Sequence, residues 1–422
     1  MKRRILSVLA TCCLLATMTP VAFAAGGNLT QVGGVYQIDD AADLVAFANL
    51  VNGGQTGANA VLTNTIDLGE ADFTPIGSDY NNPYSGTFDG AGYTIKNATI
   101  TGSDDENGFI RAGVFGCVDG TVKDITFEEI TVTNSSSASA SSEAQQAASG
   151  VAVSTLRQGG NIEDVTVLAT CSVSGVYRTG GIVGSVRQNS TVSGCTNRAS
   201  VTGSANYTGG IVGSMHDISL VSGGATTMSC ANYGEVNGTS EVGGIVGYID
   251  RGEISECNNY ADVTGSGNYG VGGIVGCNVL NPIANMEIFI PTTTSTITAC
   301  YNEGTINGPR AGGILGSFVV APNRSQSSSR NTTCAVSACT NAGDIDTENS
   351  SDACGAIYGA PITYMNGAGD QYVDHLIVLI QNCYIGGSVR NTEVSSENFE
   401  NYVSGSNYVT PSNNVFYEEV IS

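Results

Sequence analysis

Apolar and polar side chains alternate in short runs along most of the chain, and glycine or asparagine separates the runs. One run has apolar residues at Val122, Ile125 and Phe127, and the run at 162–167 repeats that spacing. Alternation with period two over a few residues, bounded by turn-forming residues, predicts β-strands. The runs contain no amphipathic stretch long enough for a helix. The pattern therefore predicts an all-β fold built from short strands.

Two motifs recur and indicate that the strands belong to one repeat. The first is a Gly-Gly-apolar-apolar-Gly block at 180–184, 209–213, 243–247, 272–276 and 312–316, with weaker copies at 112–116 and 354–359. The second is a cysteine followed two residues later by asparagine. Its cysteines are Cys195, Cys230, Cys257, Cys300 and Cys339, with Cys383 in a further copy, and its asparagines are Asn197, Asn232, Asn259, Asn302 and Asn341. The extended register gives nine copies, beginning with Ile95, Ala98 and Ile100, which it places level with Val122, Ile125 and Phe127 of the next copy.

One copy is too small to bury its own apolar side, whereas stacked copies bury it jointly. The sequence therefore predicts a parallel β-helix, that is, a solenoid. The rule for crossover connections between parallel strands makes it right-handed. In such a stack the repeated cysteines form an inward column, and the asparagines form a structural ladder of side-chain amides. We expect the glycines to supply corners with positive φ.

The ends of a stack expose strand edges and need covers. A helix over 40–52 is predicted at the N-terminal end, with Asp40 as N-cap and Gly53 as the stop. Its apolar face is Leu44, Phe47, Ala48 and Val51. We expect this helix to cap the first rung.

The first 24 residues have the features of a secretory signal peptide, because Lys2-Arg3-Arg4 precedes an apolar stretch and a small-residue site ending at Ala24. We divide the rest into an N-terminal cap and first rung (25–100), the repeats (101–390) with a Ser/Ala-rich loop (134–149), and a C-terminal cap or tail (391–422). The mature protein is expected to be secreted or at the cell surface, without membrane insertion after signal cleavage.

Charge narrows the range of partners. The chain has 15 Lys and Arg residues against 38 Asp and Glu residues, a formal net charge of −23. A nucleic-acid partner needs a basic surface, so none is expected. The sequence gives no indication of an oligomeric state.

Cysteine spacing bears on redox state and on metals. Of the 13 cysteines, Cys12 and Cys13 lie in the signal peptide, which leaves eleven and therefore at least one unpaired thiol. Neighbouring ladder cysteines could form disulfides or pack as small apolar side chains, and we expect mainly the reduced form. The spacing is not that of a zinc site, so no metal is predicted there.

The blocks such as Gly243-Gly-Ile-Val-Gly247 resemble the GLUG motif, the repeat of bacterial cell-surface β-helix proteins. The leader Leu62-Thr-Asn-Thr-Ile-Asp-Leu68 and Thr87-Phe-Asp-Gly90 are similar to the opening of the same proteins. The resemblance covers roughly 34–390 and implies an exported, adhesin-like protein. Some relatives carry a metalloprotease domain that cleaves immunoglobulin A. This chain has no His-Glu-x-x-His, so the similarity is to the non-catalytic β-helical region.

Carboxylates offer one candidate site. The fifth position after successive ladder cysteines includes Glu235, Asp262 and Asp344, which should point outward. Glu235 and Asp262 would lie about 5 Å apart, the separation of the carboxyl pair in retaining glycosidases. The same oxygens could hold Ca²⁺. We favour a solvated acidic stripe, since no lysine accompanies the pair, and we predict no catalytic residue. His216 and His375 lack a triad context, and His216 is interpreted as a surface residue.

Tyrosines and loops offer the second candidate. Tyr177, Tyr207 and Tyr269 precede Gly-Gly blocks, Tyr233 and Tyr260 follow ladder asparagines, and Tyr364 lies in one of three insertions, at 277–296, 317–335 and 360–379. Outward tyrosines can stack on sugar rings or contact a protein. We therefore expect a surface-associated binding or adhesion module for a host protein or glycan, not an enzyme. The alternatives are a carbohydrate-active enzyme and a passive structural spacer.

Overall fold

The computed structural model describes residues 29–103, 110–137, 147–216, 225–280, 294–320, 332–347, 354–362, 376–390, 392–393, 409–412 and 415–416. The predicted signal peptide, His375, Tyr364, the centre of the 134–149 loop and most of the predicted C-terminal cap lie outside these residues. The predictions made for them stay predictions.

The described strands form three sheets. The main sheet has 30 strands: β1 (Thr30–Val32), β2 (Val35–Ile38), β3 (Asn59–Leu62), β4 (Ile66–Asp72), β5 (Thr87–Asp89), β6 (Thr94–Gly102), β9 (Thr121–Asn134), β12 (Asn161–Val167), β13 (Ser172–Gly175), β16 (Thr191–Ser193), β17 (Thr196–Asn197), β18 (Ser200–Gly203), β21 (Ala225–Met228), β22 (Ala231–Asn232), β23 (Val236–Gly238), β26 (Gly252–Ser255), β27 (Asn258–Asn259), β28 (Val263–Gly265), β31 (Thr294–Thr298), β32 (Tyr301–Asn302), β33 (Ile306–Asn307), β36 (Thr332–Ser337), β37 (Thr340–Asn341), β38 (Ile345–Asp346), β41 (Leu376–Gln381), β42 (Tyr384–Ile385), β43 (Ser388–Val389), β44 (Thr392–Glu393), β45 (Val409–Ser412) and β46 (Val415–Phe416).

Two narrower sheets have eight strands each. The second sheet contains β7 (Arg111–Ala112), β10 (Ala148–Gly150), β14 (Thr179–Gly180), β19 (Asn206–Gly209), β24 (Ser240–Gly243), β29 (Val271–Gly272), β34 (Ala311–Gly312) and β39 (Cys354–Gly355). The third sheet contains β8 (Phe115–Val118), β11 (Val153–Leu156), β15 (Val183–Arg187), β20 (Val212–His216), β25 (Val246–Ile249), β30 (Val275–Leu280), β35 (Leu315–Val320) and β40 (Tyr358–Ile362).

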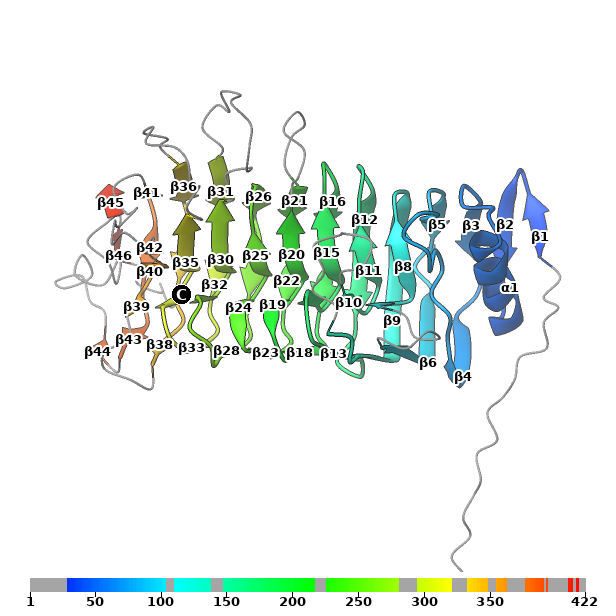
Figure 1. Ribbon diagram of the computed structural model, residues 1–422, viewed down its shortest axis with the longest axis horizontal. Coiled ribbons are helices and arrows are strands. Elements are labelled where there is room, and N and C mark those ends of the chain that lie inside the picture. The colour runs from blue at the N-terminus through cyan, green and yellow to red at the C-terminus, as the bar shows by residue number, and fades with distance from the viewer. Residues whose placement is uncertain are drawn as a thin grey trace, which may run out of the picture.

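Each strand of the repeat pairs in parallel with its counterpart in the next copy. In the third sheet, for example, Val183 lies opposite Val212, and Val212 lies opposite Val246. The copies follow one another along the long axis from the N-terminal to the C-terminal end (Figure 1). The prediction of a β-rich chain with parallel strands is therefore confirmed. This arrangement is consistent with a parallel β-helix.

One apolar interior runs through the stack. Val122, Ile125 and Phe127 of β9 are at most 2% exposed, and so are their partners Ile162, Val165 and Val167 of β12. Polar residues between them, such as Lys123 and Glu163, are more exposed. Because alternate residues of a strand point to opposite sides, the apolar set faces inward in every copy.

The structure contains the predicted helix. Helix α1 (Ala41–Asn52) begins after Asp40, whose Oδ1 accepts a hydrogen bond from the backbone N of Asp43 at 2.9 Å. Its buried residues are Leu44, Phe47, Ala48 and Val51, and the Phe47 ring contacts those of Tyr84 and Phe88. The helix lies at the N-terminal end of the stack (Figure 1). Gly53 ends it with φ −80°, and the left-handed residue is Gly54 at φ 108°.

The register of the first copy differs from the prediction. Ile95 lies opposite Phe127, and Val122 lies opposite Phe88. Placing Ile95 level with Val122 was therefore wrong. Strand β9 is long, and the apolar spacing of Val122, Ile125 and Phe127 recurs five residues later at Phe127, Ile130 and Val132, so the sequence fits both registers. The later copies keep the predicted register, for example Val192 opposite Thr227 and Asn197 opposite Asn232.

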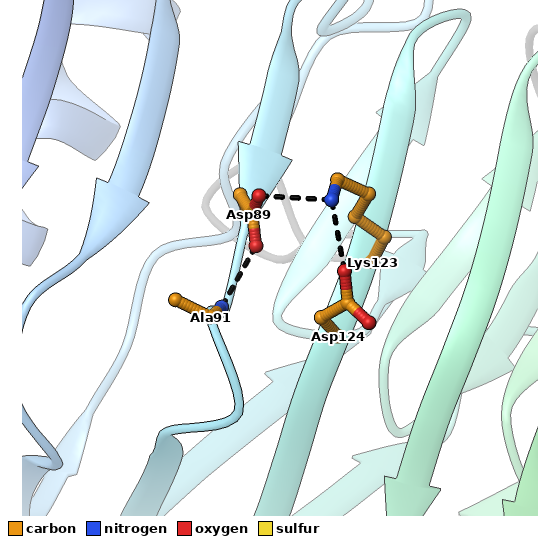
Figure 2. A network of polar contacts seen from close by, with 4 residues as sticks. All are labelled: Asp89, Ala91, Lys123 and Asp124. Carbon is orange, nitrogen blue, oxygen red and sulfur yellow. Dashed lines mark hydrogen bonds and ion pairs between the residues drawn. The ribbon is translucent and has the colours of Figure 1, made fainter.

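Lys123 connects the paired strands β5 and β9. Lys123 Nζ lies 2.9 Å from Asp89 Oδ2 and 2.8 Å from Asp124 Oδ2, and Asp89 Oδ1 accepts a hydrogen bond from the backbone N of Ala91 (Figure 2). Ala91 is left-handed, with φ 48°. Asp89 therefore stabilises a turn and links β5 to β9, and Lys123 holds its pKa below the ordinary value.

The glycines of the Gly-Gly blocks do not have the positive φ that we expected. In several copies a non-glycine residue takes the left-handed bend, such as Ser229 (φ 52°) and Glu256 (φ 56°) before the ladder cysteines. The blocks need glycine for space. A Cβ on Gly244 would lie 2.1 Å from the Gly273 carbonyl oxygen and 2.4 Å from Asn259 Cγ. The glycine content therefore reflects close contact as well as turns.

Within the described part of the chain, the single helix falls short of the length and apolar character needed to cross a membrane.

Candidate functional site

The asparagine ladder is the scaffold on which the candidate site is built. Asn232 Nδ2 donates to Asn259 Oδ1 at 2.9 Å, Asn259 Nδ2 donates to Asn302 Oδ1 at 2.8 Å, and the contact repeats from Asn197 to Asn341. Each Nδ2 also donates to the carbonyl two residues later, as Asn259 does to Ala261 at 2.7 Å. All five asparagines are fully buried. The ladder therefore fixes the position along the stack, and the direction, of the residues that follow each asparagine in the sequence.

The cysteine column lies beside this ladder. Cys195, Cys230, Cys257, Cys300, Cys339 and Cys383 are all buried. The Cys257 thiol contacts the carbonyl oxygens of Ser255 and Thr227, at 3.2 and 3.6 Å. No disulfide links any two of the eleven cysteines in the described residues. Burial raises the pKa of Cys195 and of Cys257, so these thiols are poor nucleophiles.

An exposed surface follows directly after the ladder, and we call it the tyrosine face. It consists of Arg198, Tyr233, Tyr260 and Tyr301. Tyr233 N donates a backbone hydrogen bond to Asn197 O, and Tyr260 N donates one to Asn232 O. These hydrogen bonds place Arg198, Tyr233 and Tyr260 at the same position of three successive copies. Tyr233 is 43% exposed and Tyr260 is 38% exposed.

The rings of this face are arranged as a stack. The centroids of Tyr233 and Tyr260 are 4.7 Å apart with an interplanar angle of 13°, and the Tyr301 ring lies 5.9 Å from Tyr260 at 52°. The Arg198 guanidinium covers the other side of Tyr233, with Cζ 4.4 Å from the ring centroid. Arg198 and Tyr260 thus lie on the two faces of the Tyr233 ring, and the exposed part of the stack is an aromatic surface with polar tips that suits contact with another apolar surface.

The predicted carboxylates lie next to this face and are exposed. Backbone bonds from Val236 N to Asp262 O and from Val201 N to Glu235 O place Glu235 and Asp262 on successive copies. Asp262 Oδ1 accepts from the backbone N of Thr305 at 2.9 Å, and Asp344 Oδ1 accepts from that of Ser388 at 2.7 Å. These two carboxylates stabilise turns of the following copy. Glu235 Oε1 accepts from Asn237 Nδ2 at 3.1 Å.

The other predicted tyrosines do not join the face. Tyr177 and Tyr269 are half-buried. The Tyr207 ring lies 4.4 Å from that of Tyr248 and 6.0 Å from that of His216, at the third sheet. Our interpretation of His216 as a surface residue was therefore wrong: its ring is half-buried between aromatic neighbours, and burial together with Arg187 and Arg178 lowers its pKa.

Among the described residues, the cluster of carboxylates that could bind a metal ion lies away from the tyrosine face. Asp39, Asp40 and Asp43 bring three carboxylates within 4.8 Å of one another at the start of α1. Glu235 and Asp262 are not part of a comparable cluster in that portion of the chain. The arrangement of the described carboxylates therefore gives no support to the expectation that Glu235 and Asp262 could hold Ca²⁺.

Two members of the tyrosine face were not in the sequence-based set. Arg198 and Tyr301 occupy positions next to the ladder asparagines, Asn197 and Asn302, so the ladder register could have located them. The stacking geometry itself depends on how the copies twist, which the motif does not specify.

Comparison with known proteins gives limited similarity. No family model matches the chain. It is 30% identical over 162 residues to halomucin of Haloquadratum walsbyi, a match that covers 36% of this chain and 2% of that protein. The chain thus spans a small fraction of this relative. A crystal structure of a Bacteroides ovatus protein, provisionally described as an immunoglobulin A1 protease, superposes with a TM-score of 0.48 at 17% identity, covering 80% of this chain and 91% of the other.

Proposed function

We propose that this protein is an exported, surface-associated module that binds glycan through the tyrosine face. The observation that carries the proposal is the exposed stack of the nearly parallel Tyr233 and Tyr260 rings. Sugar rings present apolar C–H surfaces that pack on aromatic rings, while their hydroxyls need polar partners. The neighbouring carboxylates of Glu235 and Glu303 can accept such hydroxyls, and Tyr301 already donates to Glu303 at 3.3 Å.

We further propose that the chain forms a right-handed parallel β-helix of the GLUG type. The parallel pairing of successive copies and the Gly-Gly blocks support this assignment. The right-handed sense follows from the crossover rule for parallel strands. A rigid stack of this kind would hold the tyrosine face at a fixed distance from a cell surface.

The proposal includes no catalytic step. The carboxylates of Asp262 and Asp344 are engaged by backbone N–H groups of the next copy, which favours a structural role for them. A retaining glycosidase would require one carboxyl to act as nucleophile and the other as acid. The partner class is a glycan of a host or of the cell's own surface.

A glycan array with the mature protein tests the proposal. Replacing Tyr233 and Tyr260 by alanine should weaken binding to the glycans that bind the wild type by about tenfold or more, because the stacking surface is lost. Tyr93→Ala is the matched control, since Tyr93 is 38% exposed but lies in the N-terminal region. Undiminished binding by the double variant would exclude this face as the site.

The same preparation separates the alternatives. Release of sugar fragments from a bound glycan would indicate the carbohydrate-active enzyme, and Glu235→Gln should then abolish it. Failure to bind any arrayed glycan, together with no effect of the tyrosine substitutions on attachment to cells, would favour the passive spacer.

A further inference from the structure

Four arginines gather at the junction of the second and third sheets, and we call this group the arginine seam. It consists of Arg111, Arg157, Arg178 and Arg187, from β7, the end of β11, the start of β14 and β15. The third-sheet strands β8, β11, β15 and β20 follow one another along the stack (Figure 1). A concentration of positive charge is unusual in a chain with a net charge of −23. Burying positive charges close together costs free energy, and this cost calls for an explanation.

The N-terminal part of the seam is organised around one tyrosine. The guanidinium carbons of Arg111 and Arg157 lie 4.7 and 4.2 Å from the centroid of the Tyr80 ring. Arg157 Nε lies 2.9 Å from Asp119 Oδ1, and Arg157 Nη1 donates to the Tyr80 carbonyl at 2.8 Å. Arg157 is therefore neutralised locally by Asp119.

Arg178 is the member whose charge is least compensated. Its side chain is 7% exposed, and its guanidinium carbon lies 5.5 Å from the Tyr207 ring centroid. Among the described residues, its Nε and Nη1 have no hydrogen-bond acceptor. Burial, with Arg187 and Arg111 nearby, lowers the pKa of Arg178 to about 10. Leaving a buried guanidinium hydrogen unpaired costs more than a neutral group would, so the fold tolerates a real penalty here.

The backbone holds Arg178 in a strained conformation. Its φ is 48°, in the left-handed region, and the residues at the same position of the next two copies, Tyr207 and Glu241, have φ of 71° and 51°. Non-glycine residues adopt this region at a cost, and such positions concentrate at functional sites. The conformation recurs while the side chain changes from copy to copy. The left-handed conformation therefore belongs to this position of the copy and is not caused by the arginine side chain.

Carboxylates near the seam do not neutralise Arg178. Asp119 is engaged by Arg157, and the Asp79 carboxylate accepts from Asn81 and Asn82. Burial raises the pKa of Glu241 to about 8, so this carboxyl is largely protonated at neutral pH. Among the described residues, Arg178 thus keeps a buried positive charge and N–H donors without an acceptor, which is the chemistry that binds an oxyanion.

We propose that the arginine seam binds a compact oxyanion, namely a carboxylate, sulfate or phosphate group, with Arg178 as its principal hydrogen-bond donor. Arg111 and Arg187 supply favourable charge, and the Tyr207 ring supplies a flat surface beside the anion. Since Arg178 is only 7% exposed, we expect a compact group and not an extended chain at this position. This site is separate from the tyrosine face and does not depend on it.

Isothermal titration of the mature protein at constant ionic strength tests the proposal. The ligands are sodium sulfate, sodium phosphate and D-glucuronate, with D-glucose as the uncharged control. We expect saturable binding of one anion per chain, weakened about tenfold or more in Arg178→Met. Arg390→Met is the matched control, because Arg390 is exposed and lies at β43. It changes the net charge equally and should leave binding unchanged.

The three anions distinguish the source of the ligand. Selective binding of glucuronate indicates an acidic sugar, whereas binding of sulfate or phosphate alone indicates an inorganic ion. Absence of saturable binding for all three, or equal binding by Arg178→Met, would overturn the proposal. A second measurement guards against a misfolded variant: without anion, Arg178→Met should unfold at the same temperature as the wild type or higher. A drop of several degrees would show that Arg178 is a structural residue instead.

Discussion

Two positions recur from copy to copy: the bend that holds the ladder asparagine, and the column of residues that precedes each Gly-Gly block. The two positions differ in how much their residues vary. At the bend, five successive copies carry the same asparagine, and each amide bonds to the next. Before the Gly-Gly blocks the corresponding residues are Arg178, Tyr207, Glu241, Gly270 and Arg310. Identical residues stabilise a stack because each satisfies its neighbour. A column whose side chains change from copy to copy is available for recognition.

The largest effect should come from crowding the bend. In Gly244→Ala, the new Cβ would lie 2.1 Å from the Gly273 carbonyl oxygen and 2.4 Å from Asn259 Cγ. Both are held by the ladder and its strands, so we expect a loss of about 4 kcal/mol or more in the free energy of unfolding. Urea denaturation measures it. Gly57→Ala is the control, since the nearest atom to its Cβ would be Ser85 Oγ at 3.8 Å. Equal, small effects of the two would show that the bend can relax.

Breaking the ladder in its middle should cost somewhat less. Asn259→Ala leaves the Asn232 donor and the Asn302 acceptor without their partners, in a fully buried position. We expect a loss of about 3 kcal/mol in the free energy of unfolding. The half-buried Asn237, which donates to Glu235, provides the control substitution Asn237→Ala. If both variants lose the same stability, the ladder contributes nothing beyond an ordinary surface hydrogen bond.

The column before the Gly-Gly blocks contains the buried carboxyl of Glu241, which should make the stability of the protein depend on pH. Burial raises the pKa of Glu241 to about 8 in the folded state, from about 4.5 when exposed. The folded protein therefore keeps a proton that the unfolded chain releases, so stability falls as pH rises from about 4.5 to 8. Glu241→Gln should remove this part of the slope and stabilise the protein at pH 8 by on the order of 2 kcal/mol.

Thermal unfolding across this pH range compares Glu241→Gln with Glu253→Gln, whose carboxylate is exposed. The exposed substitution should leave the slope unchanged. A slope that survives in Glu241→Gln would mean that this carboxyl is ionised in the folded protein.

The cysteine column should show the smallest effect on stability and a clear one on reactivity. Cys257→Ala removes one small buried side chain and should cost about 1 kcal/mol. Because the whole column is buried, and burial raises the pKa of Cys195 and Cys257, the folded protein should not react with a thiol reagent at pH 8. The denatured, unreduced mature protein should give eleven thiols. A much lower count would indicate disulfides between neighbouring copies.

The repeating interior could be predicted from the sequence because each apolar, cysteine and asparagine position recurs at one place in every copy. Val122, Cys257 and Asn302 are all buried as their motifs require. The first copy was misplaced because the apolar spacing within the long strand β9 fits two registers. Glycine was assigned to turns because composition does not reveal what a missing side chain would touch.

The outward residues were harder to predict for the opposite reason. The arginine seam collects side chains from two positions of the copy, with Arg111 and Arg178 before the Gly blocks and Arg157 and Arg187 after them. Their proximity depends on which strands lie side by side, and only the register of the second and third sheets supplies it. The tyrosine face was partly accessible, because Tyr233 and Tyr260 follow the ladder asparagines directly.

The asparagine ladder also bears on how such a chain can change in length. Each amide donates toward the C-terminal neighbour and accepts from the N-terminal one, so the row has a direction and a unit step. Duplication or deletion of a whole copy would leave each remaining amide with a partner of the same kind. A partial copy would interrupt the row. Growth by tandem duplication is therefore the change that this interior accepts most readily, and new outward residues can diverge on each added copy.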